Sequence, residues 1–402
     1  MARTTRPRKD RARPAAAAGA GTELYLELAR TVAALAEPRS LRSFTLPYPG
    51  FAQRALDHTV MRCLGIGRTP PRSLPELWEW CRSMTADDPL FDVPSSLVTR
   101  GATLVTPVGL MPTRTCLELA SHGPAGQVET EARGLLAELE GRCGSTERYR
   151  LCRRFLADHP VVQQEDRHTR NWSRDVWAKV KELYQPLPES LRVDGVFLPC
   201  PVCRLPALPR GRTLPTPTRP AADQEIWCEG EECLRPERFE PIRDPDLALI
   251  LPRSLRAYLV LPHPVETAAR NALDSAGIRH EARPGHLSAH HVRDTGHGPL
   301  EMHVYDRLQP GLLAAHLAQS PPHTHRAFIV VPERLAARDG YRASFTAALP
   351  EPLRPRLILT TPSDLVRHLT TRATESDHTM HTGTAHRRST PASARTEAED
   401  DA

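Results

Sequence analysis

Apolar residues recur at helical spacing through the first half of the chain. Leu28 and Val32 share a face of a helix that the pattern starts at Thr22. Similar stripes begin at about residues 51, 73, 127, 145 and 173, with Ser73, Ser145 and Ser173 placed as N-caps. Short β-branched runs between residues 97 and 107 predict a strand pair or an extended crossing. The pattern therefore predicts a mainly helical module over residues 22–192.

The period changes in the last third of the chain. From residue 244 onward, short apolar runs alternate with amphipathic stretches in the order α-β-β-β-α-β-α-β-α. This order fits a small mixed sheet flanked by helices, which we assign to residues 244–370. Residues 1–21 and 371–402 have polar, biased compositions, and we predict a disordered basic arm and a disordered tail.

The charge is concentrated at the start of the chain. The formal net charge is +5, from 53 basic and 48 acidic residues. The first 14 residues alone carry six basic side chains against Asp10, so the remainder is near neutral. The arm is either a solvated tail or an arm that adds salt-dependent affinity for nucleic acid. No apolar run reaches the roughly 18 residues of a membrane span, and no hydrophobic core follows the basic start. We therefore expect no membrane partner and no secretory signal.

Four cysteines have the spacing of metal ligands. Cys200 and Cys203 lie in LPCPVC, and Cys228 and Cys233 lie in CEGEEC. Four thiolates at this spacing can close a tetrahedral zinc site, and adjacent strand patterns favour a zinc ribbon over residues 193–243. Because no ligand position is left open, the zinc would be structural. The alternative is four free thiols in a reduced protein. The odd total of nine cysteines favours the reducing cytoplasm over a disulfide framework.

The element order of the C-terminal unit is also that of the PD-(D/E)xK nuclease core. Such nucleases hold Mg²⁺ with an acid on the first helix, an Asp on the second strand and an acid-x-Lys on the third. Glu266 fits the helix acid. Ser288 stands where the Asp is expected, and His303 and Tyr305 stand at the acid and lysine positions. This set indicates a degenerate site.

Neighbouring acids offer a rearranged alternative. Asp294, Glu301 and Asp306 are close enough in sequence to act as shifted substitutes, and Glu301 shares a strand face with His303. Mg²⁺ would be a cofactor only if such a rearranged site were active.

Histidines crowd the same region. They are His280, His286, His290, His291, His297 and His303. Imidazole suits zinc and other transition metals, so a second metal site is one interpretation. The other is that alternating histidines occupy the solvent faces of strands.

Several stretches resemble one family. They are GRTPPRSLPELWEWCR, RRFLADHPVV, ELYQPLPESLRVDGVFLPCPVC and MHVYDRLQPGLLAAHLAQ…RAFIVVPERL, within residues 22–370. They look like the accessory protein of prokaryotic Piwi (pPIWI-RE) three-gene defence islands. The resemblance implies a restriction-endonuclease-like domain at the C-terminus, a Piwi-like protein and a helicase as partners, and a role near nucleic acid in defence against invading DNA.

These observations predict a multidomain α + α/β chain with a mainly helical N-terminal module, a four-cysteine zinc ribbon and a C-terminal PD-(D/E)xK restriction-endonuclease-like α/β domain. Three functions stay open. The first is a nuclease-fold subunit that binds nucleic acid or island partners without cutting. The second is an active Mg²⁺-dependent DNA endonuclease with a rearranged site. The third is a zinc-ribbon DNA-binding regulator.

Overall fold

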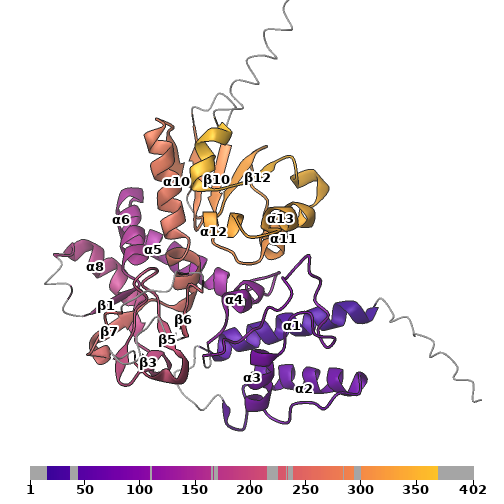
Figure 1. Cartoon of the computed structure of the whole chain (residues 1–402). Helices are drawn as coiled ribbons and strands as arrows, with labels where there is room; N and C mark the ends of the chain where they lie inside the picture. The colour runs from indigo at the N-terminus through magenta and orange to yellow at the C-terminus, as the bar shows by residue number, and fades with distance from the viewer. Residues whose placement is uncertain are drawn as a thin grey trace, which may run out of the picture.

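The computed structural model describes most of the chain, in a helical part, a cysteine-bearing part and a C-terminal sheet (Figure 1). The described residues are 16–36, 44–108, 111–163, 166, 171–214, 225–231, 233, 239–283, 285–293 and 300–369. Some of the predicted features lie outside them: residues 1–15 of the arm, the tail 371–402, Asp294 and His297.

The first four helices build one core. They are α1 (Ala16–Leu35), α2 (Gly50–Gly65), α3 (Leu74–Ser83) and α4 (Arg114–Ala120). Helix α1 begins six residues before Thr22, inside the range assigned to the disordered arm. The strand pair predicted near residues 97–107 is wrong apart from one bridge between Val105 and Pro112. Val98 and Leu104 are buried in the helical core instead, so their apolar character reflects packing rather than a sheet.

A second helical group has its own core. It comprises α5 (Val128–Cys143), α6 (Thr146–Asp158), α8 (Arg174–Val180) and the short helical turns η2 (Lys181–Leu183), α9 (Arg253–Leu255) and η7 (Arg256–Val260). Beside it lies an antiparallel sheet of order β1-β7-β2, formed by Val161–Gln163, Ala248–Ile250 and Gln185–Pro186. Strand β7 comes from the predicted C-terminal unit but pairs with strands from the predicted helical module.

The cysteine region contains short hairpins and turns. They are η3 (Glu189–Leu191), β3 (Arg192–Val193), β4 (Val196–Phe197), β5 (Ala207–Pro209), η4 (Arg210–Arg212), β6 (Ile226–Cys228) and η6 (Pro245–Leu247). Strand β3 pairs with β4, and β5 pairs with β6. The strands that connect the two cysteine turns are therefore β5 and β6. Strand β5 is buried and lies between the two pairs of cysteines.

The C-terminal unit is a five-stranded mixed sheet, as predicted. Its elements are α10 (His263–Ser275), β8 (His280–Ala282), β9 (Ala289–Val292), β10 (Leu300–Val304), α11 (Pro310–Gln319), β11 (Ala327–Val330), α12 (Glu333–Ala336), α13 (Tyr341–Ala348), η8 (Glu351–Leu353), β12 (Leu357–Thr360) and a helix over 362–369. The strand order is β12-β11-β10-β9-β8. Strands β10, β11 and β12 are parallel, whereas β8 and β9 form an antiparallel meander with β10.

Helices cover both faces of this sheet. Met302 and Val330 point to the face covered by α10 and the last helix. Ile329, one residue from Val330, points to the opposite face, which α11 and α13 cover. Side chains of neighbouring strand residues therefore reach two separate environments.

A buried ion pair joins the three parts of the chain. Arg114, at the start of α4, contacts Asp306 after β10 at 2.8 Å, and both side chains are nearly inaccessible to solvent. The same guanidinium donates to the carbonyl of Gly230 in the cysteine region at 3.1 Å. One turn later, Glu118 accepts hydrogen bonds from the backbone N–H groups of Leu308 (2.6 Å) and Gln309 just before α11. This carboxylate satisfies donors at a helix start that would otherwise be buried without partners.

A second polar contact lies between α5 and the C-terminal unit. Glu129 is 2.6 Å from Arg307 and 2.6 Å from Arg133, and 3.7 Å from His316 on α11. The guanidinium of Arg307 also lies over the ring of Tyr258, 4.7 Å from its centroid. The helical module is therefore held to the sheet by charged groups as well as by apolar packing.

We predict that Arg114→Ala lowers the free energy of unfolding by about 3–5 kcal/mol, because it leaves the buried Asp306 carboxylate without one of its cations. Urea denaturation measures the change. The control is Arg82→Ala on α3, whose pair with Glu79 is exposed and should contribute less than about 1 kcal/mol. Equal losses of unfolding free energy in the two variants would contradict the claim that the buried Arg114–Asp306 pair contributes more to stability than an exposed pair.

Stability should fall as the pH drops from about 6.5 to 4. Burial, followed by the charges of Arg307 and Arg133, lowers the pKa of His316 to about 4, although Glu129 opposes the shift. The unfolded chain therefore takes up this proton at a higher pH than the folded chain does, and the difference is worth up to about 3 kcal/mol.

His316→Gln should reduce the loss of unfolding free energy measured between pH 7 and pH 4.5. The matched control, His58→Gln, replaces a histidine whose side chain is 61% exposed on α2. A pH profile that His316→Gln leaves unchanged would argue against this role of His316.

Candidate functional site

The four cysteine sulfurs predicted to bind metal lie together. Cys200 and Cys203 follow β4, Cys228 ends β6, and Cys233 follows five residues later. Their Sγ atoms all lie within 4.8 Å of one another. Sulfurs around one tetrahedral zinc ion, with Zn–S bonds of about 2.3 Å, stand about 3.8 Å apart. The cluster therefore has the donor atoms and the size for a single metal ion.

Local backbone turns bring these sulfurs together. The N–H of Arg204 donates to the carbonyl of Cys200 at 2.7 Å, and the N–H of Glu231 donates to that of Cys228 at 2.9 Å. Arg204 and Glu231 both have left-handed backbone conformations, with φ of 61° and 54°. A Cβ atom on Gly230 would lie only 3.0 Å from a cluster sulfur. Glycine at this position leaves room for the sulfurs to approach one another.

The second cysteine turn is bound to the rest of the protein on both sides of Gly230. Glu229 pairs with Arg256 of η7 at 2.8 Å, and both are buried. Glu231 accepts a hydrogen bond from the backbone N–H of Arg114 at 2.7 Å. The cluster therefore lies within a structural junction, and a bound ion would stabilise the packing of three segments.

Glu266, the predicted helix acid, is buried on α10 and bound by an arginine and a histidine. Arg153 of α6 donates to both carboxylate oxygens, at 3.2 and 2.8 Å, and also to the backbone carbonyl of Leu287. His290 Nε2 is 2.8 Å from the carboxylate. Burial raises the pKa of Glu266, but the charge of Arg153 and the hydrogen bond from His290 outweigh it and lower the pKa well below its usual range. Glu266 is thus an ionised carboxylate with its charge compensated inside the protein.

Ser288 lies beside this pair. Its hydroxyl donates to Glu266 at 3.3 Å, and Arg153 lies at a similar distance. The position where a nuclease would carry its strand Asp is therefore adjacent to the helix acid. A guanidinium occupies the space next to both.

Glu301 is compensated in the same way on the other face of the sheet. Arg283 contacts one carboxylate oxygen at 2.8 Å, and His303 Nε2 lies 2.9 Å from the other. Burial raises the pKa of Glu301, but the hydrogen bond with His303 and the charge of Arg283 lower it by more, so the net shift is downward. Glu301 and His303 share a strand face as predicted, whereas Glu266 and His290 lie on the α10 side. Asp306 is bound by Arg114 and Arg334 at the module junction.

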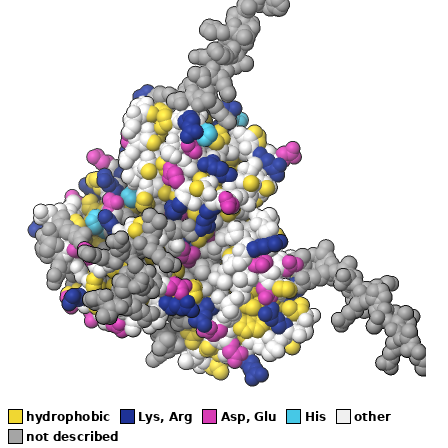
Figure 2. Space-filling view, in the orientation of Figure 1, with side chains coloured by type: hydrophobic (Ala, Val, Ile, Leu, Met, Phe, Trp, Pro, Cys, Tyr) yellow, Lys and Arg dark blue, Asp and Glu magenta, His cyan; other side chains and the backbone are white. Residues whose placement is uncertain are grey.

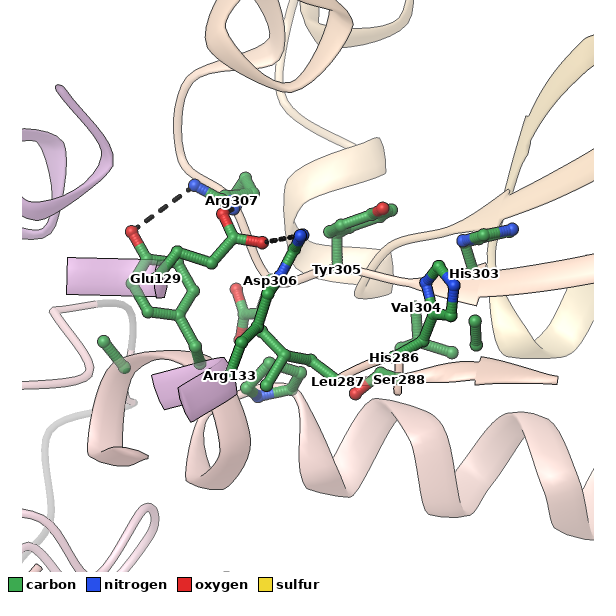
Figure 3. Close-up of a pocket in the computed structure, with 14 residues that line it drawn as sticks. Glu129, Arg133, His286, Leu287, Ser288, His303, Val304, Tyr305, Asp306 and Arg307 are labelled. Atoms are coloured by element: carbon green, nitrogen blue, oxygen red, sulfur yellow. Dashed lines mark hydrogen bonds and ion pairs between the residues drawn. The ribbon is translucent and has the colours of Figure 1, made fainter. Parts of the chain in front are cut away.

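A recess connects three of the predicted nuclease positions with the helical module. Ser288, His303 and Tyr305 line it, together with Arg133 and Arg307 (Figure 3). Its cavity volume is about 30 Å³, and the space is about 440 Å³ when the open solvent at its mouth is counted. Figure 3 shows Arg133 extending from α5 toward the segment that carries Tyr305, Asp306 and Arg307. The positions named by the nuclease pattern therefore converge in space, although the side chains there are not those of an active site.

The histidines are divided between two environments. His290 and His303 are buried and paired with carboxylates, so the expectation that the alternating histidines occupy solvent faces is wrong for these two. His286 is exposed at the mouth of the recess. Within the described ranges, only the four cysteines form a group of three or more His, Cys, Asp or Glu side chains placed to share a metal ion. The structure thus gives no second metal centre among the described histidines.

Two arginines that sequence reasoning missed complete these clusters. Arg153 belongs to α6, 113 residues before its partner Glu266. Arg283 follows β8. Nothing in their local sequence patterns distinguishes them from the many other arginines, and the only available signal was a buried acid in need of a cation.

The surface agrees with the near-neutral charge of the folded part. On the face shown in Figure 2, Lys and Arg side chains are interspersed with Asp and Glu. Among the described residues, no helix has both the length and the apolar character needed to cross a membrane.

Comparison with known families matches two separate parts of the chain. Residues 24–163, which include most of α1 and all of α2 to α6, match the family described as pPIWI_RE three-gene island domain Y. Residues 256–377, which include the mixed sheet, match the family described as REase associating with pPIWI_RE. No curated protein and no solved structure matches the chain. The chain thus carries two pPIWI_RE-associated regions, one that matches domain Y of the three-gene island and one that matches the REase associating with pPIWI_RE.

Proposed function

We propose that this chain is a non-cutting subunit of a Piwi-associated defence system against foreign DNA. In this proposal its C-terminal domain has the PD-(D/E)xK fold but binds nucleic acid or island partners instead of hydrolysing phosphodiesters. One observation carries the proposal: each described carboxylate at or near the nuclease positions is already paired with an arginine of the same protein. Glu266 is bound by Arg153 and His290, and Glu301 by Arg283 and His303.

Metal-dependent hydrolysis needs the opposite arrangement. Mg²⁺ is bound by carboxylate and carbonyl oxygens that face an open, hydrated position, and it lowers the pKa of a bound water. Here Arg153 contacts both oxygens of Glu266 and also lies beside Ser288. A guanidinium cannot activate water as a metal does, and its charge repels a second cation. Loss of metal coordination should remove most of the charge stabilisation that cleavage requires.

An active Mg²⁺-dependent endonuclease is the second candidate. The observation that favours it is the convergence of Ser288, His303 and Tyr305 on one recess. A rearranged set would have to use Glu301 with Asp294, which lies outside the described residues. The proposal of a non-cutting subunit is preferred because Glu301 is already paired on both of its oxygens.

The cysteine cluster completes the proposal. We infer that Cys200, Cys203, Cys228 and Cys233 hold a structural zinc ion in a ribbon-like module, and that the protein works in the reducing cytoplasm, because four cysteines are placed for metal and the total of nine is odd. The proposed partners are the Piwi-like protein and the helicase of the same island, together with nucleic acid.

We predict no cleavage of plasmid or single-stranded DNA by the full chain in Mg²⁺ or Mn²⁺, because the metal-binding acids are neutralised internally. Gel assays over a range of protein concentrations measure it. Metal-dependent cutting that disappears in Glu301→Ala would overturn the non-cutting assignment and support the rearranged endonuclease.

Freshly reduced protein should contain about one equivalent of zinc per chain, and Cys200→Ser should abolish its binding, because three sulfurs leave the tetrahedral site open. Elemental analysis after desalting gives the content. Cys63→Ser is the control, since Cys63 is buried in the first helical core, away from the cluster. Wild-type protein without metal, prepared under reducing conditions, would refute the zinc assignment.

A further inference from the structure

The recess between α5 and strands β9 and β10 is lined by hydrogen-bond donors. Arg133 and Arg307 contribute guanidinium groups, His286 and His303 contribute imidazoles, and Ser288 and Tyr305 contribute hydroxyls. These are the groups that proteins use to hold phosphate oxygens. The recess is open to solvent at the side where His286 is exposed.

The charges around the recess do not cancel. Its surroundings contain four paired carboxylates: Glu129, Glu266, Glu301 and Asp306. The arginines that contact them are Arg133 and Arg307 at Glu129, Arg153 at Glu266, Arg283 at Glu301, and Arg114 and Arg334 at Asp306. Glu118 also interacts with Arg114 and Arg307, so six guanidinium groups stand against five carboxylates, an excess of one positive charge. An anion entering the recess would therefore meet a positive potential.

The same arginines also lower the pKa values of two nearby histidines, His286 and His316. Partial burial of its ring, followed by Arg283, His303 and Arg133, lowers the pKa of His286 to about 4, although the residue as a whole is exposed. Burial, followed by Arg307 and Arg133, also lowers the pKa of His316 to about 4, although Glu129 opposes the shift. Both imidazoles are therefore neutral at pH 7, when each can offer one N–H donor without adding charge.

Arg133 is the accessible member of the set. Its side chain is 44% exposed, and its contact with Glu129 uses one terminal nitrogen of the guanidinium. Arg133 also lines the recess, so its side chain is accessible both to solvent and to a ligand there. Arg307, in contrast, is buried and shared between Glu129 and the Tyr258 ring.

We propose that this recess is a metal-independent binding site for a phosphate group, in which Arg133 makes the principal contact. The ligand class is a phosphate monoester or diester, from nucleic acid or from a free phosphate compound. The proposal rests on the proposed function in one respect, that the C-terminal domain binds without cutting. Guanidinium groups from the helical module and the sheet supply the positive charge that a metal ion supplies in a nuclease.

The test uses the full chain in buffer free of divalent cations. Fluorescence anisotropy measures binding of a labelled single-stranded oligonucleotide with and without a 5′-phosphate, with inorganic phosphate as competitor. Arg133→Gln should weaken phosphate-dependent binding by about tenfold or more, the usual effect of losing a hydrogen bond to a charged group. It should also reduce the slope of log affinity against log salt by about 0.7, as expected for one phosphate contact on a single strand.

Arg82→Gln is the matched control. Arg82 lies on a helix, pairs with Glu79 on the same helix and is 42% exposed, so it matches Arg133 in exposure and in having a carboxylate partner on its own helix. It should bind as the wild type does. Arg133→Lys keeps the charge and should recover part of the affinity. A thermal shift of the wild-type chain in millimolar inorganic phosphate, against chloride at equal ionic strength, tests the site without any substitution.

The outcomes separate this site from the broader function. Equal binding by Arg133→Gln and Arg82→Gln, with no thermal shift in phosphate, overturns the phosphate site but leaves a non-cutting nucleic-acid subunit intact. Binding of inorganic phosphate without any oligonucleotide binding supports the site and removes nucleic acid from the proposed function. Binding that requires added Mg²⁺ overturns the proposal of a metal-independent site.

Discussion

The buried pair of Arg114 and Asp306 is the constraint on which the rest of the structure depends. Desolvating two charges is costly unless each is fully hydrogen-bonded, and here both are. Arg114 also donates to the Gly230 carbonyl, and Asp306 also receives Arg334. One guanidinium therefore fixes the relative positions of α4, the second cysteine turn and the segment after β10. These contacts do not stabilise any single part alone. They stabilise one arrangement of all three parts against others.

The same use of arginine explains the degenerate nuclease positions. In a metal-dependent site, paired acids stay near each other because an ion compensates their charge. In this chain, arginines from α6 and from the loop after β8 provide that compensation. Glu266 and Glu301 can thus be buried on opposite faces of one sheet without an ion. The helical module supplies a charge that the C-terminal domain needs, because Arg153, which pairs with Glu266, belongs to the region that matches domain Y.

Local signals in the sequence predicted the elements well, and distant partners were not predictable. Ser73, Ser145 and Ser173 cap their helices as expected, since a cap depends on residues three positions away. The cysteine cluster was also predictable, because metal ligation restricts residue type and spacing. The pairing of β7 with β1 and the contact of Arg153 with Glu266 depend on tertiary packing. A single sequence contains no periodicity that links positions so far apart.

The docking of α11 against the first helical core has a consequence for biosynthesis. Leu312 is buried in that core, and at Gly311 a Cβ atom would lie 2.0 Å from the carbonyl oxygen of Ser96. The first core therefore stays incomplete on the ribosome until roughly two hundred further residues have been made. At about 5–20 residues per second this delay is roughly 10–40 seconds. During that interval the nascent chain exposes the apolar surface that Leu312 later covers, so we expect the N-terminal helices to need chaperone protection before the last third of the protein is synthesised.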